Sequence, residues 1–157
     1  MLDHPKGHAL VEGFGGQWLY FKAIDDVIPD PWVFEGWSED LRASMRTEAW
    51  LFFHSFVQTD RSMLDLLDSS DAFVDERLAE HYGIDGFYGP PGSFLQMQLQ
   101  GDQRGGVTRQ GAVLTALSYP TRTSPVKRGK WILGQLMCQE PPPPPPGGKP
   151  PPPPPGG

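Results

Sequence analysis

The sequence predicts a mainly α fold: a compact multi-helix domain with at most one short hairpin or strand, followed by an extended polyproline tail. Apolar residues recur at helical spacing in several stretches before residue 140, and capping residues precede some of them. Two blocks of six prolines, Pro141 to Pro146 and Pro150 to Pro155, then follow. Because proline lacks an N–H donor and has a fixed φ, we expect residues 141–157 to be a disordered linker.

The first elements are expected to be two helices separated by a loop. Residues 9–24 carry apolar side chains near helical spacing, although three glycines weaken the pattern. Residues 25–36 contain two prolines and predict a loop. The clearest helix follows: Ser38 is a suitable N-cap, two acidic residues come directly after it, and the helix is expected to end near Thr59.

The remaining elements are expected to be short. Residues 62–65 resemble a capping box and predict a helix to about Leu67. Ser70 and Asp71 are expected to cap another helix, which closes at Gly83. The residues 94–99 fit one short strand, for which we find no partner. Two final helices are expected over the ranges 107–117 and 126–137.

Composition limits the class of protein. Of the 157 residues, those that precede the tail (1–140) fit one domain of ordinary size. The net charge of −6 argues against binding to nucleic acid or to an anionic membrane. No apolar run reaches the roughly 18 residues that a membrane span needs, and the first residues lack the pattern of a signal peptide. The single cysteine, Cys138, excludes an internal disulfide.

Two short patterns resemble ligand sites. The residues 101–108 match the spacing of a phosphate-binding loop, but Val107 replaces the lysine that would neutralise the phosphates, so a glycine turn is the better interpretation. His4, His8 and Glu12 would align as metal ligands on a helix. A proline and a glycine between them disfavour that helix. We interpret His54 as a hydrogen-bonded packing residue rather than a base, and we assign no catalytic, cofactor-binding or metal-binding residue.

A basic cluster remains as a candidate site, in the segment that follows Pro120. Its members are Arg122, Lys127, Arg128 and Lys130. These cations can bind an anion, with help from the N-terminus of the following helix. The structural alternative is an arginine fork held by the carboxylates of Asp75 or Glu76. We favour this alternative, because such pairs usually hold charged loops that are bounded by prolines.

The order of these motifs resembles two modules of planctomycete-type secreted cytochrome-like proteins. Motifs within residues 16–84 resemble the end of the domain of unknown function numbered 1592. Motifs within residues 105–131, with the polyproline, resemble the domain numbered 1588. The resemblance implies three regions. They are the C-terminal part of a 1592-type helical domain (1–84), a 1588-type helical segment packed on it (85–140) and the linker (141–157).

The resemblance also implies an exported protein, periplasmic, at the cell surface or secreted. Its partners would be neighbouring domains of the same polypeptide, one of which carries haem. This chain lacks a Cys-x-x-Cys-His motif, so we expect no cofactor here. The leading hypothesis is a non-catalytic helical scaffold or docking module of a large exported cytochrome-like bacterial protein. The alternative is part of a multidomain redox or polysaccharide-directed enzyme whose active site lies in other domains.

Overall fold

The structure is a computed structural model that describes residues 5–59, 61–99 and 105–141. Helices dominate the described residues, and the strands among them form one two-stranded antiparallel sheet. The prediction of a mainly α fold is therefore confirmed. The extended tail predicted from residue 141 lies, from residue 142 onward, outside the described residues.

The N-terminal run is helical but interrupted. α1 (Pro5–Leu10) continues into a π-helical turn (Val11–Gly15) and then into α2 (Gly16–Trp18). Tyr20 ends the run, because its φ of 67° lies in the left-handed region. A 3-10 helix (Phe21–Asp26) follows it, so the helix predicted over residues 9–24 is divided at Tyr20.

The long helix α3 (Glu39–Gln58) forms as predicted. The side chain of Ser38 caps it by accepting a hydrogen bond of 3.1 Å from the N–H of Leu41. α4 (Asp65–Asp68) is a single turn, close to the predicted short helix. Ser62 accepts a hydrogen bond from the N–H of Leu64, two residues on, so the capping box read from the sequence is not formed as such.

The helix predicted from Ser70 is wrong in its first part. Residues Asp71–Val74 form strand β1, which pairs antiparallel with β2 (Leu95–Gln98), so the expected strand does have a partner. α5 (Glu76–Tyr82) begins later because Asp75 is its N-cap: the carboxylate accepts a hydrogen bond of 2.8 Å from the N–H of Leu78. The helix ends at Gly83, in the left-handed conformation, as predicted.

The first of the two last predicted helices is divided, whereas the second spans almost its whole predicted range. A 3-10 turn (Val107–Arg109) precedes α6 (Gly111–Ala116), because Gln110 between them is extended. α7 (Pro125–Trp131) has a proline in its first turn and continues into a π-helical turn (Ile132–Leu136).

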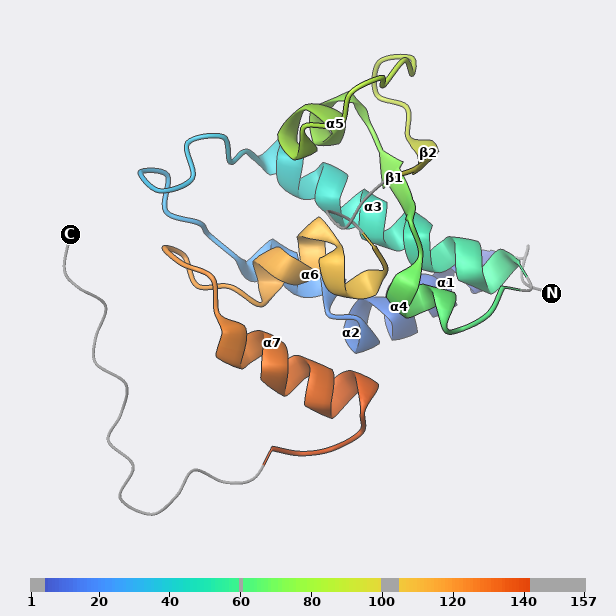
Figure 1. Cartoon of the computed structure of the whole chain (residues 1–157), viewed down its shortest axis with the longest axis vertical. Helices are drawn as coiled ribbons and strands as arrows, with labels where there is room; N and C mark the ends of the chain where they lie inside the picture. Colours follow the sequence, from blue (N-terminus) through green and yellow to red (C-terminus); the bar gives the residue numbers. More distant parts are fainter. Residues whose placement is uncertain (1–4, 60, 100–104, 142–157) are drawn as a thin grey trace.

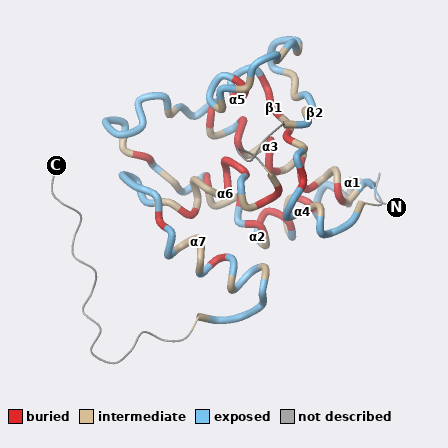
Figure 2. Tube along the Cα trace, in the orientation of Figure 1, coloured by how far each residue is buried: buried red, intermediate tan, exposed pale blue. Residues whose placement is uncertain are grey.

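One core joins the two halves of the chain. Figure 1 shows α3 across the middle of the molecule, with α5 and the sheet on one side and α6 and α2 on the other. Figure 2 shows that buried residues gather along α3, β1 and α6. Among the largest buried side chains are Phe21, Ile24, Phe52, Val74, Leu78, Val107 and Val113. The core therefore contains residues from before residue 84 and from after residue 104.

Candidate functional site

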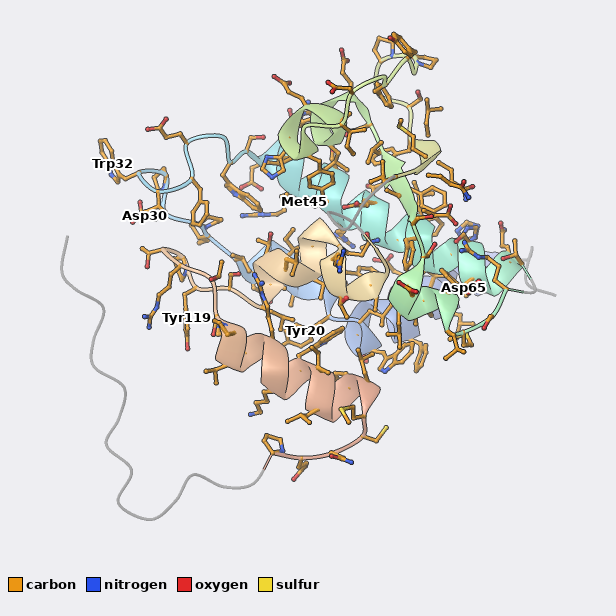
Figure 3. All side chains as sticks on the ribbon, viewed as in Figure 1. Tyr20, Asp30, Trp32, Met45, Asp65 and Tyr119 are labelled. Carbon is orange, nitrogen blue, oxygen red and sulfur yellow. The ribbon has the colours of Figure 1, made fainter. Side chains whose placement is uncertain are left out.

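Two loops lie together on one side of the molecule. The first loop comprises residues 27–37 and the second loop comprises residues 118–124. The N–H of Asp30 donates a hydrogen bond of 2.9 Å to the carbonyl of Pro120, which joins the loops. The carboxylate of Asp30 also accepts a hydrogen bond of 2.9 Å from the N–H of Trp32. In Figure 3, Asp30 and Trp32 lie on the same side of the molecule as Tyr119.

Large apolar side chains are exposed on these loops. Trp32 is 91% exposed, more than any other tryptophan among the described residues. We call the exposed set the loop surface; its members are Ile28, Trp32, Val33, Phe34 and Tyr119. Neighbouring exposed apolar side chains in one patch are typical of interaction sites, whereas single ones are common on any surface.

A cavity of about 300 Å³, the loop pocket, lies between these loops and the helices. Its walls are mainly apolar, and they include Val27, Phe34, Trp37, Leu41, Met45 and Leu114. Arg128, at the middle of α7, also lines the pocket, as does His81 from the last turn of α5. None of the described residues that line it is Asp or Glu.

The basic residues singled out from the sequence have different surroundings. The guanidinium of Arg122 lies 5.5 Å from the ring centroid of Tyr119. The ammonium of Lys127 lies 4.0 Å from the same centroid and donates a hydrogen bond of 3.0 Å to the carbonyl of Ser118. Arg128 differs, because its Nε is buried and has no hydrogen-bond partner.

The structure does not bring this basic segment to Asp75 or Glu76. The two carboxylate oxygens of Asp75 accept hydrogen bonds from the hydroxyl of Ser44, at 2.6 Å, and from the N–H that starts α5. Glu76 is exposed. None of the ion pairs between described residues includes Arg122 or Arg128. The predicted ion pair between an arginine of this segment and Asp75 or Glu76 is therefore not formed between these described residues, and Asp75 instead serves as a helix cap.

The side chains considered as metal ligands, where the structure describes them, pack or pair with other residues. His8 stacks on the ring of Trp50, with 5.4 Å between the ring centroids, and Glu12 pairs with Arg46 at 2.7 Å. His4 lies outside the described residues. Within the described ranges, no group of three or more His, Cys, Asp and Glu side chains is placed to hold a metal ion.

The side chain of His54 packs against an aromatic neighbour on α3. Its ring stacks on that of Trp50, with 4.5 Å between the centroids. Burial, and after it the nearby His8, lower the pKa of His54 below its ordinary value of 6.5. Both effects disfavour the imidazolium, so the neutral ring is the form that fits this stack.

Close packing explains why a glycine stands at position 106. Residues 101–104 lie outside the described part of the chain. Gly106 itself has a φ of 57°, and its N–H donates a hydrogen bond of 2.8 Å to the carbonyl of Ser69. A side chain at this position would overlap the carbonyl group of Leu67. The glycine is thus explained by close contact between two backbone segments.

Sequence reasoning missed the loop surface and the pocket. The available indication was the first loop, where Trp32, Val33 and Phe34 form an apolar run between prolines and an acidic residue. Loops are usually polar, so such a run indicates either a buried loop or an exposed binding surface. The structure shows that it is exposed.

The fold and this site define a mainly α module with an aromatic loop surface beside an apolar pocket that Arg128 helps to line. Residues 1–84 match the model of PSD4, described as a protein of unknown function (DUF1592), so the chain belongs to this family. Residues 104–156 match PSCyt3, also of unknown function (DUF1588). Both names come from planctomycete cytochrome-like families.

No curated protein and no solved structure matches the chain. Within the part of the chain that the structure describes, no helix has the length and apolar character needed to cross a membrane.

Proposed function

We propose that the chain is a non-catalytic helical docking module of a large exported cytochrome-like bacterial protein. Its loop surface binds a neighbouring domain of the same polypeptide. The family names support the cytochrome-like context. Haem, in this proposal, belongs to a neighbouring domain, because attachment through Cys-x-x-Cys-His needs two cysteines and this chain has one.

The exposure of Trp32 is the observation that carries the proposal. A tryptophan side chain in water leaves a large apolar area unburied, and tryptophan is enriched among the residues that dominate protein interfaces. Its backbone is already held by the carboxylate of Asp30 and by the bond between the two loops. A loop that is ordered before binding loses less conformational entropy when a partner covers it.

The polar groups buried elsewhere support a structural role. Glu48 is almost fully buried and accepts a hydrogen bond of 2.6 Å from the hydroxyl of Tyr82. Asp75 is occupied by Ser44 and by the start of α5. Buried carboxylates with such partners stabilise helix contacts, which is a sufficient reason for their presence.

The test is a titration of this chain with the adjoining domains of its parent protein, produced separately and followed by calorimetry. Trp32→Ala is expected to weaken binding by about 30-fold or more, the loss typical of a central interface tryptophan. Tyr88→Ala is the matched control, because Tyr88 is 92% exposed on the connection between α5 and β2, away from the loop surface.

Two results would contradict the proposal. One is a complex whose affinity Trp32→Ala and Tyr88→Ala change equally. The other is the absence of binding to every adjoining domain at concentrations of about 1 mM, where even weak intramolecular docking is measurable.

A further inference from the structure

We propose that the loop pocket is a binding site for a small carboxylate with an apolar body, and that Arg128 is the residue that holds the carboxylate. This site goes beyond the proposed docking role and does not depend on it. The ligand class follows from the charge, the lining and the size of the pocket.

Arg128 supplies the first argument. Its Nε is buried without a hydrogen-bond partner, and the ion pairs of the described residues do not include it. A partly buried cation without a partner is costly, because it has lost water and gained no acceptor. A guanidinium presents parallel N–H groups that match the two oxygens of a carboxylate. A bound carboxylate would therefore supply the missing acceptor.

The surroundings of Arg128 supply the second argument. Among the residues that the structure describes, no Asp or Glu lines the pocket. The sequence from residue 103 to residue 139 contains six Lys and Arg and no Asp or Glu, although the whole chain has a net charge of −6. This segment of the chain is therefore basic, which favours an anion over a cation beside α7. A neutral ligand would leave the charge of the guanidinium without an opposite charge.

The walls and the size supply the third argument. Aromatic and aliphatic side chains from the first loop, α3 and α6 form most of the lining, so the rest of the ligand is expected to be hydrocarbon or aromatic. A volume of about 300 Å³ is at the small end of ligand cavities. These features favour a monoanion with one ring or a short chain over a nucleotide or an oligosaccharide.

The experiment uses 3-phenylpropionate as the probe and 3-phenylpropanamide as its neutral counterpart. Both are titrated into the full chain and followed by amide resonances in two-dimensional NMR spectra. The carboxylate is expected to bind with a dissociation constant of about 1 mM or tighter and to shift resonances of Trp37 and Thr115. The amide is expected to bind about tenfold more weakly or worse, because it lacks the charge-assisted bonds.

Arg128→Gln tests the assignment of the anchor. Since Nε has no partner in the structure, this variant is expected to fold, with an unchanged amide spectrum away from α7. Its preference for the carboxylate over the amide should fall from about tenfold to about one. Arg122→Gln is the matched control: Arg122 is an exposed arginine on the neighbouring loop that does not line the pocket, and its variant should keep the preference.

Several results would overturn the site. They are equal binding of the carboxylate and the amide, a preference that survives Arg128→Gln, and a preference that Arg122→Gln removes equally. The site would also be overturned if the resonances of the pocket residues did not shift at about 10 mM probe, because the dissociation constant would then be far above the expected value of about 1 mM. Trp32→Ala should leave probe binding unchanged. If an adjoining domain displaces the probe, the pocket belongs to the docking interface and the small-molecule assignment is wrong.

Discussion

Replacing Gly106 by alanine tests how the two family segments are joined. Gly106 has φ 57° and ψ −176°, a combination that is close to glycine-only. An added Cβ would overlap the carbonyl group of Leu67 and stand 2.8 Å from the carbonyl oxygen of Leu66. Both neighbours are backbone atoms, which cannot rotate away as a flexible side chain does. The hydrogen bond from Gly106 to Ser69 would be strained as well.

The expected cost is large for a change of one methyl group. The unfavourable backbone conformation costs about 1–3 kcal/mol, and the overlap adds to it, so we expect about 3 kcal/mol or more. For a protein of this size, about 1 kcal/mol lowers the melting temperature by about 2–4 °C. Gly106→Ala should therefore melt about 6–12 °C below the unmodified chain, measured by circular dichroism at 222 nm.

Gly105→Ala is the control for this variant. A Cβ on Gly105 would stand 3.5 Å from the carbonyl oxygen of Ser69, which is ordinary contact, and its φ is outside the left-handed region. Its effect should stay within about 1 kcal/mol, and lower entropy of the unfolded chain can even make it stabilising. Equal melting temperatures for the two variants would refute the close approach of Gly106 to Leu67.

Two further predictions concern charged groups. The pKa of His54 is lowered in the folded state, so the unfolded chain binds the proton more tightly, and stability should fall as the pH drops below 6.5. His54→Gln should flatten this fall between about pH 7.5 and about pH 5 in urea unfolding; an unchanged slope contradicts the assignment. Because no ion pair joins Asp75 to Arg128, the stability changes of Asp75→Ala and Arg128→Ala should add within about 0.5 kcal/mol, whatever the sign of each. A coupling above about 1 kcal/mol would mean that the pair forms in solution.

Local chemistry made some elements predictable. Ser38 and the acidic residues after it mark the start of α3, and Gly83 marks the end of α5. Such residues are recognisable in a sequence because they form hydrogen bonds with the free backbone groups of a helix end only a few positions away. Strand β1 was not predictable in the same way. Ser70 and Asp71 resemble a helix cap, but pairing with β2, more than twenty residues later, decides the conformation. The true cap is Asp75.

The site was less predictable than the fold. The sequence identified Arg128 as a candidate, and it could not identify the surroundings of that side chain, because the pocket is assembled from two loops and four helices. The sequence analysis named Asp75 or Glu76 as the partner, whereas the oxygens of Asp75 accept hydrogen bonds from Ser44 and from the N–H that starts α5. An arginine in a basic segment has several possible partners, and only the tertiary structure selects among them.

The placement of the pocket bears on why the two family segments occur in one chain. The first segment supplies α3, the first loop and β1, and the second supplies α6 and α7. Val113 on α6 is fully buried in the core that α3 helps to form, and Gly106 permits backbone contact with Leu67. Removing either segment would expose that core to water, at a cost of about 25 cal/mol for each Å² of apolar surface. The loop pocket takes walls from both segments, so a ligand bound there would stabilise their association directly.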